Sequence, residues 1–77
     1  MSAAGPAPRD VEVTGTVRLG QLLKLAGAVD SGGEARELLA AGEVRVNGEV
    51  EDRRGRQLDD GDVVELGGHS WRVLVEG

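Results

Sequence analysis

Apolar residues recur at helical spacing in two neighbouring segments of the chain. They fall at i, i+3, i+4 and i+7 in the first segment and at i, i+3 and i+4 in the second: Leu19, Leu22, Leu23 and Ala26, then Ala35, Leu38 and Leu39. Thr16 is the expected N-cap of the first helix, and Gly27 its expected end. Because residues 28–30 form a short link, we expect the two helices to pack as a corner with their leucines buried together.

The second helix carries clear start and stop signals. Ser31 and Glu34 have the Ser-x-x-Glu spacing in which each side chain binds the backbone amide of the other residue. Gly42 can adopt the left-handed conformation that ends a helix without steric strain. We therefore expect a helix between these residues.

Period-two alternation replaces helical spacing after Gly42. Val44-Arg45-Val46 predicts a strand, and Asn47-Gly48 is a strong turn signal. A two-residue loop would pair Val46 with Glu49, whereas a three-residue loop would pair Val46 with Val50. The apolar pattern favours the three-residue loop, which places both valines on one face.

The remaining chain predicts short strands and turns. In order we expect an exposed loop at 52–56, a core residue at Leu58, a turn at 59–62, a strand at 63–66, a turn at 67–68 and a strand at 70–75. Residues 1–16 have no sustained period, so we expect a flexible N-terminal tail followed by one domain at 17–77. The fold class is α+β, with a two-helix unit followed by a small, mostly antiparallel sheet.

Composition limits how such a chain is stabilised and what it binds. With 77 residues, 39% hydrophobic content and no cysteine, it has room for one small aliphatic core. The net charge of −5 is unusual for a nucleic-acid-binding domain. Between Arg18 and Arg56, however, seven basic residues balance seven acidic ones, and the excess of acid lies after Gln57. No apolar run approaches the roughly 20 residues of a membrane span, so we expect a cytoplasmic protein.

The order of the motifs resembles a known family. Arg18-Leu19 with Leu22 and Leu23, the segment Ser31-Gly32-Gly33-Glu34-Ala35-Arg36 and the segment 42–48 are similar to the RNA-binding domain first known from ribosomal small-subunit protein S-four. The core of that domain is called the alpha-L motif. The resemblance covers Val17 to about Leu66, and it is greatest to the small stand-alone bacterial members, which are thought to bind RNA.

The resemblance also implies a binding surface. In this family, RNA lies against the first part of the second helix, the adjoining helix and the edge of the hairpin. The positions that match are Lys24, Ser31, Gly32, Gly33, Arg36, Arg45, Asn47, Arg53, Arg54 and Arg56. Many members have a basic residue where this chain has Gly32. The implied partner is structured RNA, with the ribosome as a candidate, bound by a monomer without a cofactor.

Two clusters among these residues have alternative explanations. The amides at Ser31-Gly32-Gly33 suit a phosphate, but the serine could simply cap the helix. Arg53, Arg54 and Arg56 can contact phosphate, or they can form a solvated loop paired with Asp52 and Glu51. Three arginines so close together repel one another unless an anion or an acidic partner is present.

Other functional classes fit the sequence less well. A protein-interaction domain could dock its arginines on an acidic partner. A beta-grasp sulfur carrier is a weaker alternative, because such carriers end in Gly-Gly whereas this chain ends Val75-Glu76-Gly77. His69 has no cysteine or second histidine with which to share a metal ion, and no catalytic triad or nucleotide loop is present. We therefore expect a binding protein and no enzyme.

Overall fold

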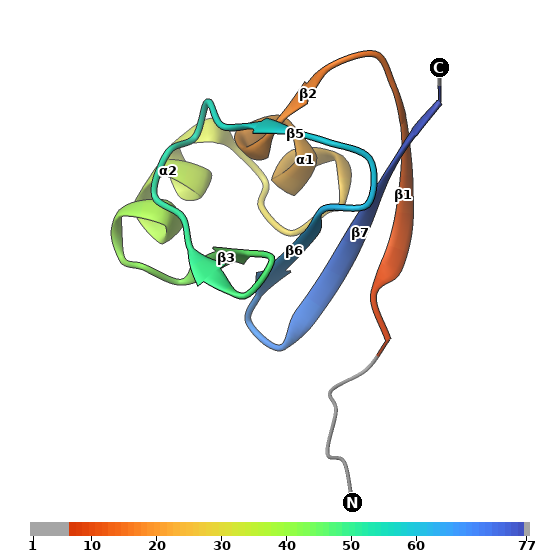
Figure 1. The fold of residues 1–77 in the computed structure, drawn as a ribbon. Helices are drawn as coiled ribbons and strands as arrows, with labels where there is room; N and C mark the ends of the chain where they lie inside the picture. Colours follow the sequence, from red (N-terminus) through yellow and green to blue (C-terminus); the bar gives the residue numbers. More distant parts are fainter. Residues whose placement is uncertain (1–6, 77) are drawn as a thin grey trace, which may run out of the picture.

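Two short helices lie against one face of a five-stranded sheet (Figure 1). A computed structural model describes residues 7–76. The elements in chain order are β1 (Arg9–Thr14), β2 (Val17–Arg18), α1 (Leu19–Leu25), α2 (Gly32–Ala40), β3 (Val44–Val46), β4 (Glu49–Val50), β5 (Gln57–Leu58), β6 (Val63–Leu66) and β7 (His69–Glu76). The predicted α+β class is confirmed, because every strand pair except β1–β7 is antiparallel.

The strands form two sheets. The large sheet has the order β1-β7-β6-β3-β4, and β2 pairs with β5 in a separate two-stranded ladder. In that ladder Val17 is opposite Leu58 and Arg18 is opposite Gln57. The ladder joins the chain that enters α1 to the chain that leaves the loop at residues 52–56, which we call the arginine loop.

Alternation along the strands creates the core. Val44, Val46, Val64 and Val73 point to the helix side of the sheet and are fully buried. Leu19, Leu22, Leu23, Ala35 and Leu39 cover them from α1 and α2. The predicted joint burial of the helix leucines is confirmed, with Leu38 half-buried at the margin. Trp71 is 6% exposed and belongs to this core.

Both helices end in the same C-terminal motif. Gly27 and Gly42 have φ values of 74° and 75°, and the amide that follows each glycine donates to a carbonyl five residues earlier. This is the Schellman arrangement, which satisfies the last carbonyls of a helix. The predicted helix ends are therefore confirmed. Within the described chain, neither helix is long and apolar enough to cross a membrane.

The helix starts differ in detail from the prediction. Arg18, not Thr16, is the N-cap of α1, and the Gln21 side chain accepts from its amide at 3.0 Å. The prediction of Thr16 was wrong because β2 lies between that residue and the helix. At α2 the Ser31 hydroxyl accepts from the amide of Glu34 at 3.2 Å, as predicted. The Glu34 carboxylate, however, accepts from the amide of Asp30 and not from that of Ser31.

The hairpin has a two-residue loop, so the predicted three-residue loop is wrong. Asn47 and Gly48 have φ values of 53° and 86°, and Val46 pairs with Glu49. Two left-handed residues form the turn type whose twist matches that of paired strands, and this outweighs the apolar pairing. Val50 is 52% exposed as a result.

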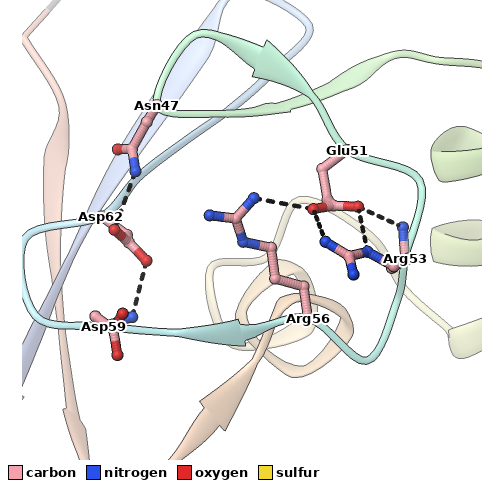
Figure 2. Close-up of polar contacts among 6 residues, drawn as sticks. All are labelled: Asn47, Glu51, Arg53, Arg56, Asp59 and Asp62. Atoms are coloured by element: carbon pink, nitrogen blue, oxygen red, sulfur yellow. Dashed lines mark hydrogen bonds and ion pairs between the residues drawn. The ribbon is translucent and has the colours of Figure 1, made fainter.

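The Asn47 side chain ties the hairpin to the next turn. Its Nδ2 donates to Asp62 Oδ1 at 3.0 Å (Figure 2), and its Oδ1 accepts from the Val63 amide at 3.0 Å. Asp62 also accepts from the amide of Asp59 at 2.8 Å. Asn47 thus holds β6 against the hairpin.

The N-terminal segment differs most from the prediction. Instead of a flexible tail over 1–16, Arg9–Thr14 forms β1, parallel to β7 along six residue pairs. An ion pair of 2.9 Å joins Arg72 to Asp10, and Val13 is buried. The partner strand lies more than 60 residues away, so no local pattern could indicate the pairing. Residues 1–6 of the expected tail lie outside the described residues.

Replacing Val13 with Ala tests whether β1 belongs to the folded domain. Losing two buried carbon atoms should lower the free energy of unfolding by about 1–2.5 kcal/mol. Replacing the exposed neighbour Glu12 with Ala should change it by less than about 0.5 kcal/mol. Urea unfolding measures both variants, and an equally small effect of the two would contradict the incorporation of β1.

Candidate nucleic-acid interface

The arginine loop is docked on the start of α1 through its backbone. Three hydrogen bonds make the contact: Leu19 N–H donates to Arg56 O at 2.8 Å, Gly20 N–H to Arg54 O at 2.9 Å and Arg18 Nη1 to Gly55 O at 2.7 Å. The first amides of a helix have no partner within the helix, so these carbonyls satisfy groups that would otherwise need water. The loop and the helix start therefore form one unit.

Glu51 holds the arginine loop in shape from inside. Its carboxylate accepts four hydrogen bonds, from Arg53 N at 3.0 Å, Arg53 Nε at 3.1 Å, Arg53 Nη2 at 3.3 Å and Arg56 Nη1 at 2.9 Å (Figure 2). Glu51 itself is 6% exposed. A buried carboxylate is costly unless donors surround it, and here two guanidinium groups and an amide do so.

These contacts set the protonation state of Glu51. The hydrogen bonds from the Arg53 side chain and backbone, followed by that from Arg56, lower the pKa of Glu51 from 4.5 to about 2. Burial acts in the opposite direction but is outweighed. Glu51 is therefore ionised at neutral pH and paired with two positive charges.

A groove lies between the start of α1, the start of α2 and the arginine loop. Its volume is about 330 Å³, and it is lined by Arg18, Gly20, Gln21, Lys24, Gly32, Ala35, Arg54 and Gly55. We call it the α1 groove. Arg18, Gln21 and Lys24 recur every three residues, so they project from one side of the helix. The groove thus has a polar helix wall and a loop wall.

The position of Arg54 in this groove depends on two glycines. A methyl group at position 20 would lie 2.5 Å from Cγ of Arg54, so the stem of the arginine lies directly on the helix backbone at Gly20. A methyl group at position 32 would lie 3.9 Å from Nη1 of Arg54. The guanidinium group therefore reaches across from α1 to the first residue of α2.

The charge of the α1 groove is opposite to that of the whole protein. Arg18, Lys24 and Arg54 line it, and none of its described lining residues is acidic. The chain as a whole carries a net charge of −5. Asp59 and Asp60 instead line a hollow at the β5 end of the molecule, together with Gly15 and Thr16. The α1 groove and this hollow therefore carry charges of opposite sign.

The structure brings together some of the expected site residues and separates others. Lys24, Gly32 and Arg54 line the α1 groove. Ser31, Gly33 and Arg36 lie on α2 or at its cap, next to Gly32 but outside the lining. Arg45 lines a different hollow with Glu43 and Glu65, and Asn47 binds Asp62 and Val63. The expected residues thus do not all line one groove.

The loop arginines also divide into two kinds. Arg53 and Arg56 have an acidic partner inside the chain, Glu51, which is part of the alternative that the sequence left open. Arg54 is absent from the hydrogen bonds on Glu51 and turns to the α1 groove. Of the three arginines, Arg54 is the one that lines the α1 groove.

Sequence reasoning missed Arg18, Gly20 and Gln21 as lining residues. A signal for two of them was present, because Arg18, Gln21 and Lys24 form the i, i+3, i+6 polar stripe beside the leucines of α1. Gly20 gave no such signal. Its role depends on the close approach of Arg54, which comes from a loop more than 30 residues away.

The two-helix corner, the hairpin that follows it and the groove between helices and loop define a small domain of the alpha-L type. The chain belongs to the S4 domain family, whose model matches residues 11–74. The predicted resemblance to protein S-four is therefore confirmed. The match begins within β1, in agreement with the part that this strand plays in the sheet.

Relatives of known name cover most of the chain. It is 49% identical over 72 residues to the probable ribosome maturation protein RlbA of Bacillus subtilis (strain 168), covering 92% of this chain and 97% of that protein. It is 41% identical over 59 residues to the putative RNA-binding protein YbcJ of Escherichia coli (strain K12), covering 77% of this chain and 84% of that protein. The solution structure of E. coli YbcJ, described as revealing an alpha-L motif involved in RNA binding, matches with a TM-score of 0.68 and 33% identity over 96% of each chain.

The lowered pKa of Glu51 predicts a pH-dependent stability. A folded-state pKa near 2 against 4.5 means that the ionised carboxylate stabilises the fold above about pH 4.5 and that this contribution is lost as the pH falls toward 2. Replacing Glu51 with Gln should therefore lower the free energy of unfolding by about 1–3 kcal/mol at neutral pH. The difference from the parent should shrink steadily in acid.

Urea unfolding of both proteins over a pH series measures this difference. The matched control is Glu49→Gln, which removes an exposed carboxylate from β4 two residues earlier. It should leave the free energy of unfolding within about 0.5 kcal/mol of the parent. A difference between parent and Glu51→Gln that does not change between neutral and acid pH would contradict the assigned role of the carboxylate.

Proposed function

We propose that this protein binds structured RNA, and that the α1 groove holds its phosphate backbone through charge and shape. The observation that carries the proposal is the collection of Arg18, Lys24 and Arg54 around one groove without an acidic residue among the described lining, in a protein of net charge −5. Phosphate contacts dominate the affinity of nucleic-acid binding. A basic groove in an acidic protein is therefore the natural place for a polyanion.

The groove suits phosphate better than bases. Arg54 can fork onto two phosphate oxygens, and Lys24 supplies a point charge on the facing helix wall. Trp71, the one aromatic residue among Phe, Trp and Tyr, is buried and offers no stacking surface. Recognition by backbone and shape suits a folded RNA with a bulge or junction.

The α2 start adds a smaller contribution. Gly32 lines the groove at the positive end of the helix, where backbone amides favour an anion. Ser31 already caps the amide of Glu34, and the Glu34 carboxylate lies in the same first turn. The side chains of Arg54 and Lys24 should therefore contribute more to phosphate binding than the helix end does.

The names of the relatives support a ribosomal target. The B. subtilis relative is called a probable ribosome maturation protein, and the E. coli relative a putative RNA-binding protein. We infer that a monomer of this chain acts in the cytoplasm as a binding module, not as an enzyme, on ribosomal RNA or a particle that contains it. A tRNA-like fold is the other structured RNA that fits the same contacts.

Replacing Arg54 with Ala should weaken binding of a labelled RNA hairpin with an internal bulge by about tenfold, the effect of one lost charge-assisted contact. Lys24→Ala should act in the same direction. Arg72→Ala removes an equal charge that pairs with Asp10 on the strands and should have little effect. Fluorescence anisotropy measures all three variants.

A salt series on the same proteins tests the mechanism. Three phosphate contacts predict a log–log slope of about −2 to −3 for the parent, shallower by roughly one in Arg54→Ala. No binding by the parent at low salt would overturn the proposal and favour an acidic protein partner for this groove. Equal losses in Arg54→Ala and Arg72→Ala would show attraction by overall charge and not by the groove.

Replacing Gly20 with Ala should separate stability from binding. Alanine favours a helix by up to about 1 kcal/mol over glycine, but its methyl group would meet the stem of Arg54 and push it from the groove. We expect a folded protein with RNA affinity close to that of Arg54→Ala. In the Gly20→Ala, Arg54→Ala double variant the methyl group should not weaken RNA binding further, which fluorescence anisotropy can check. Unchanged RNA affinity of Gly20→Ala would show that packing of the Arg54 stem on Gly20 does not matter for RNA binding.

A further inference from the structure

We propose that Glu51, an acidic and buried residue, is a positioning residue for RNA binding, because it holds the arginine loop closed on α1 and thereby holds Arg54 in the α1 groove. The inference rests on the proposed function and adds to it a residue outside the groove lining. It also assigns different roles to adjacent arginines. Arg53 and Arg56 support the loop through their hydrogen bonds to Glu51, and Arg54 makes the contact with RNA.

The anchor of this arrangement is the sheet. The Glu51 amide donates to Val44 O at 3.0 Å, so the residue continues the pairing of the β3–β4 hairpin into the loop. Its side chain is 7% exposed and therefore has little freedom to move. The carboxylate is thus a fixed point in space before any arginine binds to it.

The loop is built around this fixed point. Glu51 accepts from the backbone and side chain of Arg53 at one end of the turn and from the side chain of Arg56 at the other. The Arg56 amide in turn donates to Arg53 O at 3.2 Å, which closes the turn. Both ends of the turn are held, so Arg54 at its tip has a defined direction.

The closed turn presents its carbonyls to α1. Arg54 O and Arg56 O accept from the amides of Gly20 and Leu19, and this contact places the Arg54 stem on Gly20. If Glu51 no longer holds the turn, the carbonyls and the arginine leave together. The apparent affinity for RNA then falls in proportion to the fraction of molecules whose loop is closed.

A positioning role of Glu51 predicts a change in RNA affinity opposite to the change expected from its charge alone. Removing a negative charge close to an RNA-binding groove should tighten binding, because the repulsion of phosphate decreases. Positioning predicts weaker binding instead. Two variants separate the effects: Glu51→Gln removes the charge, and Glu51→Asp keeps it but is one methylene too short to reach both arginines.

The first measurement is hydrogen exchange without RNA. In both variants the amides of Leu19 and Gly20 should lose protection relative to the core amides of Val64 and Val73. Loss of global stability alone would lower the protection of all four together and would overturn the proposal. Glu49→Gln is the matched control, with unchanged protection at all four. Should Glu51→Gln fail to fold, Glu51→Asp carries the test at reduced temperature.

The second measurement is binding of the labelled bulged hairpin at fixed salt. We expect Glu51→Gln and Glu51→Asp to weaken binding by roughly three- to tenfold, as a loop closed in a third to a tenth of molecules requires. Glu49→Gln should bind as tightly as the parent or slightly tighter. Added to Arg54→Ala, either Glu51 change should cause little further loss, because Glu51 acts through Arg54.

The outcomes separate the two proposals. Parent-like or tighter binding by folded Glu51→Gln, or independent losses in the Arg54 background, would overturn the positioning role and leave the groove as the RNA site. No binding by the parent would overturn the RNA function. The exchange experiment would then still decide whether Glu51 controls the loop.

Discussion

A buried carboxylate that must be surrounded by donors is the constraint on which the rest of this structure depends. Glu51 is fixed by the hairpin and hidden from solvent, so its charge is tolerable only because Arg53 and Arg56 donate hydrogen bonds to it. These hydrogen bonds give the arginine loop its shape. That shape delivers backbone carbonyls to the first amides of α1, and it leaves Arg54 facing outward. One internal ion cluster thus orders both the helix start and the groove.

The distribution of charge explains how an acidic protein can attract RNA. Glu51 offsets part of the positive charge of Arg53 and Arg56. The charges that face solvent in the α1 groove come from both helix and loop, whereas Asp59 and Asp60 lie near β5. A groove lined by charge of one sign focuses the local field and attracts ligands of the opposite charge.

The small size of the domain makes each connection count. A 77-residue chain without disulfides depends on its aliphatic core. β1 extends the sheet by pairing with β7, and it adds Val13 to the core. The match to the S4 domain family includes this strand, since the matched region runs from β1 to β7.

The sequence by itself determined the elements whose signals are local. Helical spacing of Leu19, Leu22 and Leu23, the Ser31 cap, the glycine stops and the Asn47-Gly48 turn each act within a few residues, so their prediction needed no knowledge of distant partners. The family could be recognised from the sequence for the same reason, because the resemblance lies in the order of these local motifs.

Tertiary structure decided what distant segments do to one another. β1 exists because it pairs with a strand more than 60 residues away. The hairpin register was predicted wrongly although its cause is local, because the twist of the Asn47-Gly48 turn outweighs the apolar pairing of Val46 with Val50. Lys24, Gly32 and Arg54 meet while Arg45 lies elsewhere, because docking of the loop on Gly20 sets the groove. Arg53 and Arg54 are adjacent in sequence but have different partners. Glu51 is only two residues from Arg53, whereas the groove lined by Arg54 forms only when the loop docks on α1.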